Sequence, residues 1–153
     1  MFDKGNFIVN IKVKKLQEQA ILPYRATSDS AGADLYACLT EPVTILPNQT
    51  VKIGTGIAIE IPSGYAAFVY GRSGLGVKYN VAPANCVGVV DADYRGELIV
   101  ALKNSAQVAF TIHPGDRIAQ MVIAPVVMSD FIEVADLSET KRGTGGFGST
   151  GIA

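Results

Sequence analysis

Turn-forming residues interrupt this chain at intervals of roughly eight to twelve residues, and no long stretch shows a helical period. Pro47-Asn48, Pro62-Ser63-Gly64 and His113-Pro114-Gly115 are such turns, and short apolar or alternating runs lie between them. Short strands separated by regular turns are typical of an all-β sandwich or barrel. The pattern therefore predicts an all-β fold, with one short helical turn over residues 77–80.

Two of the expected strands, residues 52–61 and 65–70, are separated only by Pro62-Ser63-Gly64. Proline and glycine at these positions are typical of a tight turn, so we expect the two strands to form a hairpin.

Composition limits the classes of function. The chain has 153 residues, of which 48% are hydrophobic, and 13 basic and 14 acidic residues give a net charge of −1. This length suits a single domain with its own core. The charge balance argues against non-specific nucleic-acid binding, and no apolar run is long enough to span a membrane.

Few residues are available for metal or thiol chemistry. Cys38 and Cys86 lack metal-ligand spacing, and we expect both to be reduced, buried thiols in a cytoplasmic protein. His113 is the only histidine and lies in a turn, so a histidine-based metal cage or triad is not expected. The polar N-terminus does not resemble a signal peptide.

The segment from Gly88 to Gly96 joins two apolar runs, residues 87–90 and 98–102, and carries two acidic residues. We interpret the runs as buried strands meeting at a tight turn. Asp91 follows the first strand directly, so it is the better candidate for a partly desolvated general base, with Asp93 further out. The alternative is that both are ordinary turn formers, which is common for Asp.

A second loop, Gly71 to Gly76, contains three glycines together with Arg72 and Ser73. Accessible backbone amides, an arginine and a serine near a helix N-cap are suited to anion binding. An ordinary surface turn is an equally good interpretation of this loop alone.

Three polar residues lie among apolar neighbours. Asp34 is either an edge carboxylate or a residue that orients an arginine in a site. Asn85 is expected to be buried, where its amide would read a nucleobase or pin a loop. Gln120 is expected on the same face as Ile118 and Val122, either hydrogen-bonded in the core or in contact with a ligand.

The C-terminus differs from the rest of the chain. Five glycines lie between residues 143 and 151, together with Arg142, Phe147, Ser149 and Thr150. Such a segment is costly to order and cannot form a core. It is either a flexible linker or a lid that closes over a ligand.

Five ordered motifs together resemble the dUTPase (deoxyuridine triphosphatase) family over nearly the whole chain. They are residues 31–36 (AGADLY), 71–75 (GRSGL), 88–96 (GVVDADYRG), 115–120 (GDRIAQ) and 142–150 (RGTGGFGST). The resemblance implies a jelly-roll-like β-barrel or sandwich of the β-clip type. It also implies a barrel domain over residues 1–137 and a flexible arm over residues 138–153.

The resemblance further implies the reaction and the residues that perform it. Asp91 would activate the water that attacks the α-phosphorus of dUTP, giving dUMP and pyrophosphate. This reaction keeps uracil out of DNA and supplies dUMP for dTMP synthesis. Asp34 would order the charges from behind the site, and the implied substrate-binding residues are Arg72, Ser73, Gly74, Asn85, Gly88, Tyr94, Gln120, Arg142, Phe147, Gly148, Ser149 and Thr150.

The resemblance also implies a homotrimer with active sites between subunits, and Mg²⁺ held by the triphosphate and water rather than by side chains. The alternatives are a dUTP-dependent regulatory binding protein, a related dCTP deaminase and a purely structural trimer. The strand over residues 98–102 offers no carboxylate for deamination, and a structural trimer leaves the arginine and phenylalanine of the tail unexplained.

Overall fold

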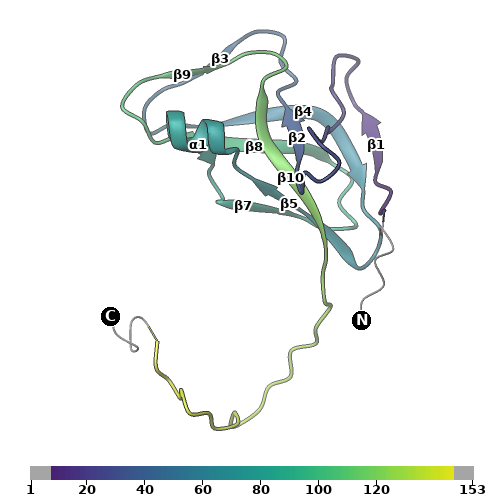
Figure 1. The fold of residues 1–153 in the computed structure, drawn as a ribbon, viewed down its shortest axis with the longest axis vertical. Helices are drawn as coiled ribbons and strands as arrows, with labels where there is room; N and C mark the ends of the chain where they lie inside the picture. The colour runs from purple at the N-terminus through teal and green to yellow at the C-terminus, as the bar shows by residue number, and fades with distance from the viewer. Residues whose placement is uncertain (1–7, 147–153) are drawn as a thin grey trace.

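The computed structural model describes residues 8–146 and is built almost entirely from strands, with one short helix (Figure 1). This confirms the predicted all-β, jelly-roll-like class. The strands are β1 (Lys12–Lys15), β2 (Ala33–Tyr36), β3 (Val43–Ile45), β4 (Thr50–Glu60), β5 (Tyr65–Tyr70), β6 (Val81–Pro83), β7 (Val87–Val90), β8 (Glu97–Asn104), β9 (Phe110–Ile112) and β10 (Arg117–Pro125).

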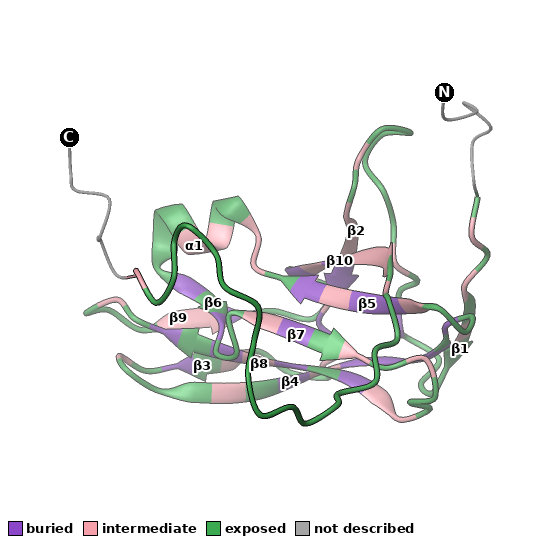
Figure 2. Cartoon of the chain, turned by 90° about the horizontal axis from the view of Figure 1, so that it is seen from below, coloured by how far each residue is buried: buried purple, intermediate pink, exposed green. Residues whose placement is uncertain are grey.

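Two antiparallel four-stranded sheets make up the body of the molecule. One has the strand order β1-β4-β8-β6 and the other has the order β2-β10-β5-β7, while β3 and β9 form a separate pair. Buried residues of both sheets form one apolar core. Figure 2 shows these buried residues along the strands, whereas the segment after β10 is mostly exposed. Leu35, Ile57, Leu102 and Ile118 are among the fully buried members of the core.

The expected hairpin at residues 62–64 is wrong. The turn itself is present, with Gly64 at φ +83°, where glycine is favoured. However, β4 and β5 do not pair, because β4 belongs to one sheet and β5 to the other. The turn therefore carries the chain between sheets, and alternation within a strand does not reveal which strand will be its partner.

The strands around the acidic turn also differ from expectation. β7 and β8 lie in different sheets, and β7 is an edge strand on which Val89 is 59% exposed. The apolar run therefore predicted a strand correctly, but its burial was overestimated. β6 and β7 are likewise in different sheets, so the segment that precedes Asp91 is not a paired hairpin.

The single helix, α1 (Ser73–Tyr79), begins earlier than predicted. Arg72 is its N-cap residue and makes no side-chain capping bond, so Ser73 is the first helical residue rather than the cap. The helix ends at Asn80, whose backbone is left-handed with φ 54°. Because Gly74 and Gly76 lie inside the helix, part of the glycine-rich loop is in fact helical.

Both cysteines are free thiols, but only Cys38 is partly buried, and the expectation that Cys86 is buried is wrong. Cys86 lies at φ 60° in the exposed turn before β7. No helix within residues 8–146 is long and apolar enough to cross a membrane.

Candidate functional site

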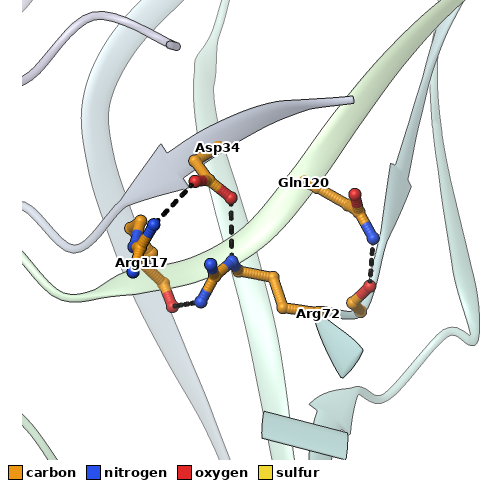
Figure 3. A network of polar contacts seen from close by, with 5 residues as sticks. Asp34, Arg72, Arg117 and Gln120 are labelled. Carbon is orange, nitrogen blue, oxygen red and sulfur yellow. Dashed lines mark hydrogen bonds and ion pairs between the residues drawn. The ribbon is translucent and has the colours of Figure 1, made fainter. Parts of the chain in front are cut away.

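Asp34 on β2 pairs with two arginines from distant parts of the chain (Figure 3). Its Oδ1 accepts a hydrogen bond from Arg72 Nε at 2.8 Å, and its Oδ2 lies 3.4 Å from Arg117 Nη1. The Asp34 and Arg72 side chains are only 15% and 23% exposed, whereas that of Arg117 is 52% exposed. The carboxylate therefore fixes Arg72 in place and leaves Arg117 more accessible to solvent.

Sheet geometry brings these groups together. Gln120 on β10 lies directly opposite Asp34 on β2 and Tyr70 on β5. Arg72 follows β5 after one glycine, so the end of that strand delivers the guanidinium to the carboxylate. The ion pair is thus built by strands that are far apart in sequence and adjacent in the sheet.

Gln120 holds the loop that carries Arg72. Its Nε2 donates a hydrogen bond to the carbonyl oxygen of Gly71 at 2.9 Å (Figure 3). A Cβ at Gly32 would lie 2.7 Å from Gln120 Oε1, so this glycine allows the amide to lie close to the backbone. The structure thus shows Gln120 bonded to this loop rather than within the apolar core.

The predicted apolar face around Gln120 is wrong in one respect. A β-bulge between Arg117 and Ala119 interrupts the alternation of β10 at Ile118. Ile118 is fully buried, while Gln120 is half-buried. Gln120 and Val122 remain two residues apart in the uninterrupted part of β10 and are both half-buried, so only Ile118 departs from the predicted face.

Asp34, Arg72, Ser73, Arg117 and Gln120 line one open pocket of about 330 Å³. Two arginines paired with one carboxylate leave an excess positive charge, which together with the Ser73 hydroxyl suits an anion with several oxygens. Gly74 lies in the first turn of α1 but does not line this pocket.

A second pocket, of about 240 Å³, lies along the turn between β7 and β8. Four of the predicted site residues line it, namely Asn85, Gly88, Asp91 and Tyr94. Its remaining walls are mainly apolar residues of β7 and β8. A pocket with apolar walls, one amide and the carboxylates of Asp91 and Glu97 suits a small, flat polar ligand.

Asn85 and Asp91 are both exposed, so the expected burial of the amide and the expected desolvation of the carboxylate are wrong for a single chain. The Asn85 side chain has no hydrogen-bond partner among residues 8–146 in the structure, which leaves its amide free for a ligand. Both residues line the second pocket and are open to solvent there.

Tyr94 folds back over its own turn. Its hydroxyl donates a hydrogen bond to the carbonyl oxygen of Glu97 at 3.0 Å, and the ring lies over Gly96. Arg95 Nη1 donates to the carbonyl oxygens of Ala92 at 2.7 Å and Tyr94 at 3.0 Å. The turn that carries Asp91 is therefore braced by its own side chains.

The two pockets share no lining residue in the single chain. Asn85, Gly88, Asp91 and Tyr94 are gathered in one, while Arg72, Ser73 and Gln120 are gathered in the other. The structure therefore assembles two partial sites rather than one complete site.

The C-terminal segment runs away from the sheets after β10 (Figure 1). Arg142 lies there, with its Nε donating to the carbonyl oxygen of Gly145 at 2.8 Å. The other predicted tail residues, Phe147, Gly148, Ser149 and Thr150, lie outside the described residues. Within the described ranges, no group of three or more His, Cys, Asp or Glu side chains could hold a metal ion.

Two further residues, Arg117 and Glu97, line these pockets and were not predicted from the sequence. Arg117 lies in the motif over residues 115–120, yet only the pairing of β10 with β2 shows that its side chain reaches Asp34. Glu97 follows the acidic turn and lines the same pocket as Asp91. Its position immediately after Gly96 was the only signal available.

The fold and the two pockets define a class of mostly-β proteins in which an arginine-lined anion pocket and a carboxylate-bearing turn share one scaffold. The dUTPase family model matches residues 18–151. A deoxyuridine 5'-triphosphate nucleotidohydrolase of Desulfitobacterium hafniense is 54% identical over 133 residues, covering 86% of this chain and 88% of the relative. The chain belongs to the dUTPase family.

Solved structures support this assignment. A mutant dUTPase of Staphylococcus bacteriophage 80alpha with dUpNHpp has a TM-score of 0.86 and 28% identity, covering 94% of this chain and 99% of that chain. A mutant dUTPase from phage phi11 of S. aureus, described with a structural Mg(II) ion, has a TM-score of 0.76 and 27% identity. That match covers 83% of this chain and 97% of that chain.

Proposed function

We propose that this chain is a dUTP diphosphatase that hydrolyses dUTP to dUMP and pyrophosphate, with Asp91 as the general base. The observation that carries the proposal is the pocket in which Asn85, Gly88, Asp91 and Tyr94 come together. Family membership supports the reaction, and the geometry supports the roles of individual residues.

Asp91 is suited to activating water because its carboxylate is exposed at the mouth of this pocket. It would accept a proton from the water as the water oxygen bonds to the α-phosphorus. The bond from that phosphorus to the bridging oxygen then breaks, and pyrophosphate leaves with the electron pair.

Uracil recognition would combine Asn85 with the free edge of β7. This strand pairs only with β5 in the described sheet, so its other backbone groups are available to a ligand. A Cβ at Gly88 would lie 3.1 Å from Asn85 Nδ2 and 3.3 Å from Val69 Cβ. The backbone can therefore approach a base closely, which disfavours the extra methyl of thymine.

Sugar recognition would depend on the Tyr94 ring, which lies against the turn beside the same pocket. A ring packed on the deoxyribose leaves no room for a 2'-hydroxyl. This arrangement would select deoxynucleotides.

The triphosphate would be held by Arg72, Ser73, Gly74 and Gln120. Asp34 holds the Arg72 guanidinium through Nε, and Nη1 makes only a long contact of 3.5 Å with the carbonyl oxygen of Arg117 (Figure 3). The outer nitrogens would therefore turn to phosphate oxygens with little loss. Hydrogen bonds to charged groups contribute about 1.5–3 kcal/mol each, so Arg72 should matter strongly.

Mg²⁺ fits this arrangement as a substrate-bound ion. The described residues offer no carboxylate cage, and Mg²⁺ commonly keeps several waters while binding substrate phosphates. When bound, it would offset part of the triphosphate charge.

The complete site would lie between subunits of a homotrimer. In the single chain the two pockets are separate, and six apolar side chains after β10 are strongly exposed, namely Val127, Met128, Phe131, Ile132, Val134 and Leu137. Such a run is costly in water, and burial against neighbouring copies removes that cost. Light scattering would give the trimer mass.

The chain would then divide into a barrel domain, residues 1–137, and an arm, residues 138–153. Arg142, Phe147, Gly148, Ser149 and Thr150 of the arm would close over the bound nucleotide, with Phe147 covering uracil. An arm at this end of the chain is supported by the last described strand, which ends at Pro125, and by the exposure of the residues that follow it.

The direct test is pyrophosphate release with Mg²⁺ from dUTP, dTTP, dCTP and UTP. We expect release from dUTP alone. Equal release from UTP would refute the role of Tyr94, and dUTP binding without any release would refute the enzymatic proposal.

A further inference from the structure

The Glu97 side chain fills a gap in the ladder between β4 and β8, next to the position at which Glu97 itself lies opposite Ala58. The register between these strands shifts between Gly54 and Ala58, where β4 bulges. At the bulge, Gly56 lies at φ +67° and its N–H donates to Glu97 Oε1 at 2.7 Å. The carboxylate thus replaces a backbone acceptor that the interrupted ladder does not supply.

The gap is shaped to hold this carboxylate. A Cβ at Gly54 would lie only 2.5 Å from Glu97 Oε1, so no larger residue fits there with Glu97 in place. The neighbouring Thr55 is buried, and its hydroxyl donates to the carbonyl oxygen of Leu98 at 2.6 Å. Thr55 and Gly56 of β4 are therefore both hydrogen-bonded to the first residues of β8.

The same residue also anchors Tyr94. The Tyr94 hydroxyl donates to the Glu97 carbonyl oxygen at 3.0 Å, and a Cβ at Gly96 would collide with the tyrosine ring. Glu97 thus contacts β4 through its side chain and Tyr94 through its backbone. A displacement of Glu97 relative to β4 would move the acceptor that holds the ring.

We propose that Glu97 is a positioning residue that sets sugar selectivity, by fixing Tyr94 against the β4 scaffold. This inference rests on the proposed function, in which Tyr94 excludes the 2'-hydroxyl. Rejecting one added hydroxyl by steric exclusion requires the ring to be held to within a fraction of an ångström. The β4 bulge provides a rigid reference for that position.

The test compares Glu97→Ala with Glu97→Gln in the full-length protein, by measuring dissociation constants for dUMP and UMP by calorimetry. Gln retains the oxygen that accepts from Gly56, whereas Ala removes it. We expect Glu97→Ala to lower the preference for dUMP over UMP about tenfold, and Glu97→Gln to keep it close to that of the wild type. An unchanged preference in Glu97→Ala would overturn the proposal.

Gly54→Ala provides a second route to the same result. The added Cβ would displace the carboxylate without changing residue 97, so the preference for dUMP should fall here too. A role of Glu97 in stability alone would lower the melting temperature of both variants and weaken both nucleotides equally, which would also overturn the proposal.

Measuring nucleotide binding and dUTP turnover separately distinguishes a failure of the proposed function from a failure of the positioning role of Glu97. If the wild type releases no pyrophosphate from dUTP, the proposed function fails, while the binding preference still reports on Glu97. If the wild type binds dUMP and UMP equally, the positioning role is refuted even where dUTP is hydrolysed.

Discussion

Arg72 Nε and Asp34 Oδ1 are 2.8 Å apart, in an ion pair whose two side chains are largely shielded from solvent. Lys12 and Glu60 form a pair of the same length on the surface, where their side chains are 77% and 46% exposed. The two pairs differ in burial rather than in distance. Only the first lies in a pocket of the candidate site.

Asp34→Asn should therefore raise the KM for dUTP about tenfold, because Arg72 loses its orienting charge. Steady-state kinetics measure this effect. Glu60→Gln is the matched control and should leave KM unchanged, since exposed pairs contribute little. Equal effects of the two substitutions would contradict a specific role for Asp34.

Gly88→Ala should weaken dUTP binding without unfolding the protein. The added methyl would lie 3.1 Å from Asn85 Nδ2 and 3.3 Å from Val69 Cβ, so the amide must shift. We expect KM to increase by about tenfold, as judged by kinetics beside a thermal melt. An unchanged KM would show that the Asn85 amide does not read the base.

Gly76→Ala is the matched glycine control and makes a prediction of its own. A Cβ there meets nothing within 4 Å, and the residue lies inside α1. Alanine should stabilise the helix by about 0.5–1 kcal/mol, measured by urea denaturation. A loss of stability would show that α1 requires glycine at this position.

Much of this architecture could be predicted from the sequence, and the errors have physical causes. The positions of turns follow from Pro, Gly and Asn, whose backbone preferences are local. Strand partners are not local, which is why the chain at residues 62–64 crosses between sheets although its sequence is typical of a hairpin.

In the candidate site too, local features could be predicted from the sequence, whereas features that depend on strand pairing could not. The resemblance named Asp34 and Arg72, but the reach of Arg117 to Asp34 depends on the register of β2 and β10. Asp91 lines a pocket after β7, while its exposure could not be foreseen. The short run before it is as apolar as a central strand, yet β7 lies at the sheet edge.

Asn104 should be essential for stability. It is fully buried, its Nδ2 donates to the carbonyl oxygens of Ile45 and Val108, and its Oδ1 accepts from Ala106 N–H. Asn104→Ala should cost about 2–4 kcal/mol in the free energy of unfolding, because one buried and two partly buried hydrogen bonds are lost. The exposed Gln107→Ala is the control, and equal unfolding free energies for the two variants would contradict this account.

The Cys38 thiol should lose its proton at a higher pH than an ordinary cysteine. Partial burial, followed by the negative charge of Glu97, raises the pKa of the Cys38 thiol, whereas Lys15 lowers it. In a Cys86→Ser background, the rate of alkylation should rise with pH at a higher midpoint in the folded protein than in urea. Glu97→Gln should move that midpoint downward only in part, since burial remains.

The raised pKa of Cys38 also predicts how stability depends on pH. A group whose pKa is higher in the folded state favours folding fully below its unfolded pKa. That contribution is lost as the pH rises through the folded value. The free energy of unfolding should fall in alkaline solution less steeply in Cys38→Ala than in the wild type, and equal slopes would contradict the shift.

The central claim is that Asp91 activates the attacking water, and Asp91→Asn tests it most directly. The amide has the same shape but cannot accept the proton, so nucleotide affinity should be retained while turnover falls by about 10²–10⁴-fold or more. Pyrophosphate release from dUTP, measured beside calorimetric binding of a non-hydrolysable dUTP analogue, separates the two properties. Intact binding with almost no release is the result that we predict, and release at the wild-type rate would contradict the assignment.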